Sequence, residues 1–80
     1  MDERTLLRHI SVDPLRCGGR PCIRGHRIPA ELILDLLASG VTPRELCGPE
    51  YYPSLTLDDI LACIAYANRY VKEDLAVSRR

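Results

Sequence analysis

One turn-rich segment dominates the first half of this sequence: Cys17-Gly18-Gly19-Arg20-Pro21-Cys22-Ile23-Arg24-Gly25-His26-Arg27-Ile28-Pro29. It combines three Gly, two Pro and three Arg with almost no helical signal. Glycine permits a positive φ, and proline fixes φ and lacks a backbone N–H, so together they favour tight turns between short extended pieces. The segment therefore predicts a small β element. The residues that we expect to shape its backbone are Gly18, Gly19, Pro21, Gly25 and Pro29.

The same segment carries Arg20, Arg24 and Arg27. Guanidinium groups bind phosphates and carboxylates in a bidentate manner, so these arginines are candidate contacts to DNA or to a protein partner. Scattered, solvated arginines are the alternative interpretation. Residues 1–29 hold six Arg against three acidic residues, a formal charge of +3, and the remainder of the chain balances it at −3. If the chain binds nucleic acid, the N-terminal third is the expected surface.

Apolar spacing predicts two short strands and then helices. His9 to Val12 is typical of a strand that ends at Asp13-Pro14, and a second extended piece is expected near residues 22–24. From residue 30 the apolar positions follow a helical period, which predicts a helix over 30–39 that stops at Gly40. Thr42-Pro43-Arg44-Glu45 then supplies a capping box for a short second helix.

A third, longer helix is predicted from Thr56-Leu57-Asp58-Asp59, whose hydroxyl and carboxylates suit a helix N-terminus. Its helical spacing continues for about twenty residues, more than the core of so short a chain can cover. We expect the part beyond about residue 66 to pack on a second copy or on a partner, the alternative being a helix that frays past the core. The expected apolar stripe is Leu57, Ile60, Leu61, Ile64, Ala67 or Asn68, Val71 and Leu75.

These elements predict a single mainly α domain over residues 1–80: a β element at 9–29, a three-helix unit at 30–76 and a tail at 77–80. The order of the helices is that of a trihelical helix-turn-helix. Two features argue against base reading by the third helix. The loop over residues 48–55 is longer than a standard helix-turn-helix turn, and Asp58-Asp59 would repel phosphates.

Several functional classes lack sequence support. No apolar run approaches the ~20 residues that a membrane span needs, and the N-terminus lacks a signal-peptide pattern, so we expect a cytoplasmic protein. Its four Cys are then expected as reduced thiols, and their spacing fits no familiar zinc site. There is no Ser/His/Asp set or phosphate-binding loop at a recognisable spacing, so we expect neither an enzyme nor a cofactor.

An ordered series of motifs covers most of the chain. It runs Gly18-Gly19-Arg20-Pro21-x-Ile23-x-Gly25-x-Arg27-Ile28-Pro29, Ser39-Gly40-Val41-Thr42-Pro43-x-Glu45-Leu46, Tyr52-Pro53-x-Leu55-Thr56 and Asp59-Ile60. Over residues 9–70 it closely resembles the small bacterial family catalogued as domain of unknown function 433, although His26 stands where we expect Thr. The resemblance implies a homeodomain-like helix-turn-helix fold with an N-terminal β element.

The same resemblance implies a function as an antitoxin of VapB type, encoded beside a PIN-like ribonuclease toxin. The expected partners are that toxin, a second copy in a homodimer and operator DNA, through which the protein would autorepress its operon. PIN-type nucleases hold a metal with clustered carboxylates, so an antitoxin can inhibit by covering that site or placing an arginine against it. The alternative function is a small DNA-binding transcriptional regulator without a toxin.

We expect the chain beyond about residue 66 to hold the toxin, while the β element forms the dimer. The candidate toxin-binding residues are Tyr66, Tyr70, Val71, Leu75, Arg79 and Arg80.

Overall fold

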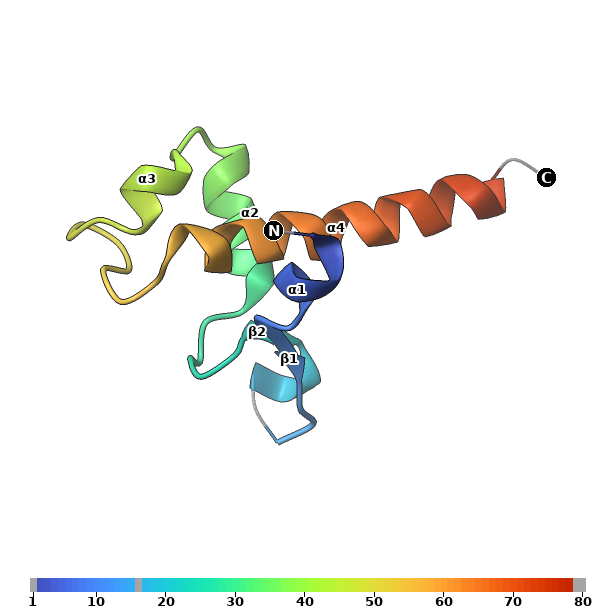
Figure 1. Cartoon of the computed structure of the whole chain (residues 1–80), viewed down its shortest axis with the longest axis horizontal. Helices are drawn as coiled ribbons and strands as arrows, with labels where there is room; N and C mark the ends of the chain where they lie inside the picture. Colours follow the sequence, from blue (N-terminus) through green and yellow to red (C-terminus); the bar gives the residue numbers. More distant parts are fainter. Residues whose placement is uncertain (1, 16, 79–80) are drawn as a thin grey trace.

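A computed structural model of the chain describes residues 2–15 and 17–78, and for residues 74–78 the backbone alone. Four α-helices and two short strands follow one another around a small core (Figure 1). Their order is α1 (Glu3–Leu7), β1 (Ile10–Val12), the 3-10 turn η1 (Cys17–Gly19), β2 (Pro21–Ile23), α2 (Ala30–Ala38), α3 (Pro43–Leu46) and α4 (Leu57–Ser78).

The long helix α4 is the axis of the molecule. Its first half contacts α1, α2, α3 and β1, whereas its second half extends away from the body (Figure 1). The helix continues to Ser78, two residues past the expected end of the three-helix unit. Within the described part of the chain, no helix is both long and apolar enough to cross a membrane.

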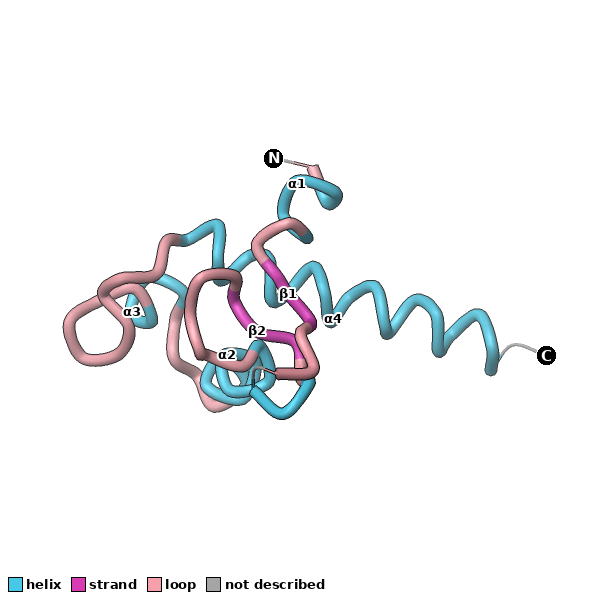
Figure 2. Tube along the Cα trace, turned by 90° about the horizontal axis from the view of Figure 1, so that it is seen from below, coloured by secondary structure: helices cyan, strands magenta, loops and turns pink. Residues whose placement is uncertain are grey.

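The two predicted strands form an antiparallel pair, which lies side by side in Figure 2. Ile10 pairs with Ile23, Ser11 with Cys22 and Val12 with Pro21. Ile10 and Ile23 are both buried, so the pair places its apolar side on the core. Cys22 also bridges to Pro29, so the chain folds back on β2 before it enters α2.

The capping residues in the sequence correctly predicted the end of α2 and the start of α3. The Thr42 side chain accepts from the Glu45 N–H and the Glu45 carboxylate accepts from the Thr42 N–H, which confirms the capping box at α3. Gly40 follows α2 with a φ of 105°, as a helix stop requires. The helix α1 was not expected; it begins where Asp2 accepts a hydrogen bond from the Thr5 N–H.

The face by which α4 meets the core differs from the expected stripe. Ile60, Ala62 and Cys63 are fully buried, whereas Leu57 and Leu61 are exposed by 48% and 45%. Before residue 66 the expected stripe therefore meets the core through Ile60, whereas Leu57, Leu61 and Ile64 are exposed by 40% or more. It was drawn through the largest apolar side chains, but the small residues Ala62 and Cys63 allow α4 to approach the rest of the body closely.

Candidate functional site

The Gly/Pro/Arg segment is a pair of turns on either side of β2. Before β2, Gly18 takes a φ of 63° in η1. After it, Gly25 takes a φ of 83°, and the His26 N–H donates to the Ile23 carbonyl to close the turn. Adding a Cβ at Gly18 or Gly25 would meet no neighbouring atom, so the requirement for glycine at these positions is conformational.

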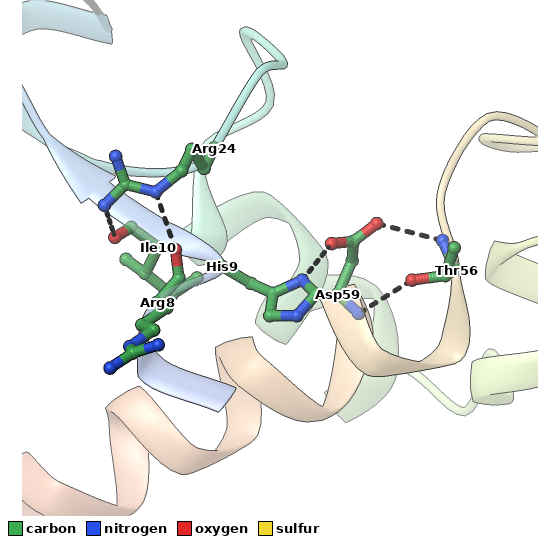
Figure 3. Close-up of polar contacts among 6 residues, drawn as sticks. All are labelled: Arg8, His9, Ile10, Arg24, Thr56 and Asp59. Carbon is green, nitrogen blue, oxygen red and sulfur yellow. Dashed lines mark hydrogen bonds and ion pairs between the residues drawn. The ribbon is translucent and has the colours of Figure 1, made fainter. Parts of the chain in front are cut away.

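Arg24 is bound to the body of its own chain (Figure 3). Its Nε donates to the Arg8 carbonyl at 2.6 Å and its Nη2 donates to the Ile10 carbonyl at 3.1 Å. The neighbouring His9 carbonyl accepts from the Arg24 N–H, and strand carbonyls alternate in direction, so the Ile10 carbonyl points away from β2, toward the outer edge of β1. Arg24 therefore covers that edge, and two of its donor groups are already engaged.

The other two arginines of the segment remain more accessible. Arg20 donates from Nε to the Cys17 carbonyl at 3.1 Å, and its Nη1 lies 3.8 Å from Oε2 of Glu31, with both side chains more than half exposed. Arg27 is exposed, and among the described residues its side chain makes no hydrogen bond or ion pair. The three arginines thus have three different environments and do not form one anion-binding cluster.

Cys17 and Cys22 are joined by a disulfide, with their Cα atoms 6.8 Å apart. The expectation of four reduced thiols is therefore wrong for this pair, because η1 turns the chain and brings the two sulfur atoms together. Cys47 and Cys63 are free. Burial, together with the charge of the nearby Asp59 carboxylate, raises the pKa of the Cys63 thiol to about 12. Cys63 is accordingly a packing residue rather than a nucleophile.

A polar cluster joins the N-terminal part of the chain to the start of α4 (Figure 3). Oδ1 of Asp59 lies 2.8 Å from Nδ1 of His9, and its Oδ2 accepts from the Thr56 N–H at 2.9 Å. Burial opposes the charged form of Asp59, but the hydrogen bonds from Thr56 and His9 outweigh it and lower the pKa of the carboxyl. This cluster is structural: Asp59 caps α4 and holds His9, so it is not free to bind a ligand.

Beside the β element lies an open apolar hollow between α2 and α4, which we call the α2–α4 groove. It has a volume of about 290 Å³. Tyr66 and Tyr70 form one wall; their ring centroids are 5.2 Å apart and their hydroxyl oxygens 3.2 Å apart. That hydrogen bond, with burial, raises the pKa of Tyr66 to about 12. The complete lining is Pro21, Ala30, Glu31, Leu34, Asp35, Tyr66, Ala67 and Tyr70.

The α2–α4 groove combines aromatic walls with an acidic border. Glu31 and Asp35 are exposed on successive turns of α2, so their carboxylates border an otherwise apolar hollow. Tyrosine rings and nearby carboxylates both favour a guanidinium or ammonium group. The groove is therefore suited to an apolar protein segment that carries a basic side chain. Leu34 and the two carboxylates were not expected as site residues, because only tertiary packing brings α2 beside α4.

A larger hollow, about 470 Å³, lies beside α3 and is lined by Thr42, Arg44, Glu45, Gly48, Pro49 and Glu50. The side chains of Thr42 and Glu45 already form the capping box there. Unlike the α2–α4 groove, this hollow has no aromatic side chain in its lining. No three His, Cys, Asp or Glu side chains gather into a metal-binding group over residues 2–15 and 17–73.

Of the six candidate toxin-binding residues, the three whose side chains are described do not lie on one surface. Tyr66 and Tyr70 line the α2–α4 groove, whereas Val71 is 54% exposed and is not part of its lining. Leu75 lies in α4, at a position where only the backbone is described. Arg79 and Arg80 lie outside the described residues.

Comparison with known proteins shows which family and which solved structure this chain resembles. Residues 10–67 match the model of a family described as Protein of unknown function (DUF433). The structure is similar to the crystal structure of a DUF433 member protein from Anabaena variabilis ATCC 29413, with a TM-score of 0.73 and 29% sequence identity. That alignment covers 94% of this chain and 73% of the other. No curated protein matches the chain significantly.

Proposed function

This chain belongs to the DUF433 family, and on that premise we propose that it acts by binding another protein, as the VapB-type antitoxin of a PIN-like ribonuclease toxin. The observation that carries the proposal is the α2–α4 groove, in which Tyr66 and Tyr70 stand beside the carboxylates of Glu31 and Asp35. The motif resemblance supplies the class of partner, and the groove supplies a place for that partner to bind. The protein has no catalytic role in this proposal.

Tyr66 and Tyr70 are suited to act as the anchors of such an interface. Large aromatic side chains that are already held by packing contribute much of the affinity at protein interfaces and lose little conformational entropy on binding. The contact between the two rings restricts both side chains before the partner arrives. Tyr70 is 53% exposed, so a substantial part of its ring is available to be covered.

Inhibition of the nuclease follows most simply if the bound antitoxin covers the entrance to the acidic metal site. Of the motif arginines, Arg24 is held by two backbone carbonyls, whereas Arg27 is exposed. Arg27 is accordingly the motif arginine that we assign to an acidic surface of the toxin. Arg79 and Arg80 stay candidates for the same role on sequence grounds alone.

Co-expression with the adjacent reading frame tests the proposal. We expect the tagged chain to retain a small nuclease and to suppress its RNA cleavage. The double variant Tyr66→Ala/Tyr70→Ala should lose the nuclease, whereas Tyr51→Ala, which changes an exposed tyrosine away from the groove, should keep it. Equal retention by both variants would contradict the role of the groove, and elution without any nuclease would contradict the antitoxin assignment.

Direct DNA binding is a second candidate function, as the operator contact of the antitoxin or in a regulator without a toxin. It is favoured by the exposed Arg20 and Arg27 in the positively charged N-terminal third. In this proposal α2, α3 and α4 are arranged like a homeodomain, and the β element rather than the start of α4 contacts the DNA. Binding to the protein's own promoter should weaken steeply with salt and weaken further in Arg27→Ala.

A further inference from the structure

A second apolar surface runs along α4 on the side that faces away from the core. Four of its side chains are large and apolar, and each is exposed by 40% or more: Leu57, Leu61, Ile64 and Val71. Asn68, also exposed, lies among them. We call these five residues the outer stripe.

The outer stripe is separate from both the core and the α2–α4 groove. With 3.6 residues per turn, Leu61 lies about 200° around the helix from Cys63, which is fully buried. Tyr66 and Tyr70 lie on the same side of the helix as the buried residues and line the groove. The lining of the groove contains no member of the outer stripe. A partner in the groove and a partner on the outer stripe would therefore occupy different sides of α4.

The spacing of the outer stripe is that of a coiled-coil seam. From Leu57 to Val71, consecutive members are separated alternately by four and three residues. In a heptad repeat this spacing places Leu61 and Asn68 at a positions and the other three members at d positions. A solitary solvent-exposed helix has no requirement for this alternation, whereas a pair of helices does.

The strands offer a poorer dimer interface than α4. The outer edge of β1 is covered by Arg24, which binds the carbonyls of Arg8 and Ile10. The outer edge of β2 is flanked by the segment that follows it, where the Ile23 N–H donates to the Ile28 carbonyl and Cys22 bridges to Pro29. Both edges of the strand pair are therefore poorly placed for pairing with another strand.

The charged residues beside the outer stripe indicate which partner packs on it and in which orientation the two helices lie. Asp58 and Lys72 each follow a d position, and neither side chain makes an ion pair or hydrogen bond within the described residues. If a second α4 packs antiparallel, with the two-fold axis near the level of Tyr66, Asp58 of each copy lies opposite Lys72 of the other. In a parallel pair, Lys72 would face Ala67 and Asp58 would face the chain before α4.

We propose that two copies of this chain pair through the outer stripe, with their α4 helices antiparallel and two Asp58–Lys72 ion pairs flanking the seam. The described seam spans two heptads, about 21 Å of helix, so the dimer should dissociate in the micromolar range or above. The pairing does not rest on the proposed function, because it needs neither a toxin nor DNA.

Charge exchange tests the pairing on the full chain without any partner. Asp58→Lys and Lys72→Asp should each weaken the dimer about tenfold, because each change places like charges together twice. The double variant should restore the dissociation constant, which sedimentation equilibrium measures. Single variants with unchanged dimerisation, or a double variant weaker than either single one, would overturn the antiparallel pairing.

The seam itself is tested by Val71→Gln, which leaves the core intact because Val71 is more than half exposed and does not belong to the hydrophobic core. It should abolish the dimer, while Leu32→Gln, which changes an exposed leucine on α2, should not. Circular dichroism confirms that both variants keep their helices. A wild-type chain that stays monomeric up to about 1 mM, or a Val71→Gln variant that still dimerises like wild type, would overturn the proposal.

Discussion

Nδ1 of His9 lies 2.8 Å from Oδ1 of Asp59, and so a single polar contact joins the end of α1 to the first turn of α4 across fifty positions of sequence. Asp59 is 8% exposed, and its other oxygen accepts from the Thr56 N–H. One carboxylate therefore caps the longest helix and fixes the N-terminal segment beside it. Charged hydrogen bonds in such a partly buried place contribute more than exposed ion pairs do.

Asp59→Asn should lower the free energy of unfolding by about 1–3 kcal/mol at neutral pH, because the amide loses the charged acceptor for His9 and for the helix cap. Urea denaturation at low protein concentration measures this difference. The matched control is Asp58→Asn, which removes a neighbouring carboxylate that makes no hydrogen bond within the described residues. Equal losses in the two variants would contradict the special role of Asp59.

The stability should also depend on pH through the same group. The pKa of Asp59 is lowered from its ordinary value of 3.8, so the unfolded chain holds the proton more strongly than the folded one. Its contribution is therefore complete above that ordinary value and is lost as the pH falls through the folded-state pKa. The difference between wild type and Asp59→Asn should shrink as the pH falls below 3.8. A difference that stays constant over this range would contradict the assignment.

Arg24→Ala should destabilise the β element, since the Arg8 and Ile10 carbonyls lose their donors. We expect a cost of about 1–2 kcal/mol and faster amide hydrogen exchange in β1. Arg27→Ala provides the matched control, and as a surface change it should alter stability by less than about 0.5 kcal/mol. Similar effects of the two substitutions would show that Arg24 is not a structural arginine.

The Cys17–Cys22 disulfide predicts a specific labelling pattern. In the unfolded chain without reductant, alkylation should modify Cys47 and Cys63 alone, and reduction should make Cys17 and Cys22 reactive as well. Mass spectrometry counts the added groups. Because the closed loop is short, reduction should cost about 2 kcal/mol of stability. Modification of all four Cys without reductant would contradict the disulfide.

Local signals were sufficient to locate most of the elements. Thr42 and Glu45 specify the start of α3 through contacts between near neighbours, and Gly40 ends α2 by a preference of its own backbone. Such interactions act within a few residues, so the sequence pattern contains them. The helix α1 was missed because its five residues carry no long apolar period.

Contacts between residues that are distant in the sequence could not be predicted from such local signals. Helical spacing marked the apolar residues of α4, but spacing alone does not say which side meets the core, and small Ala62 and Cys63 proved to be the buried ones. Arg24 was expected to contact a ligand, yet it binds backbone that is distant in sequence. The α2–α4 groove likewise depends on the packing of two helices. Tyr66 and Tyr70 of α4 were among the candidate site residues, whereas Glu31 and Asp35 of α2 were not, because the sequence does not show which helices lie side by side.

In the proposed function, the α2–α4 groove is the surface that holds a nuclease toxin. The most direct test is the dissociation constant between this protein and the product of the adjacent reading frame, the proposed nuclease, measured by calorimetry for wild type, Tyr70→Ala and Tyr51→Ala. We predict that Tyr70→Ala weakens binding by about 2 kcal/mol or more, as loss of an interface anchor does, and that Tyr51→Ala matches wild type. Unchanged affinity in Tyr70→Ala would rule out the α2–α4 groove as the toxin-binding surface.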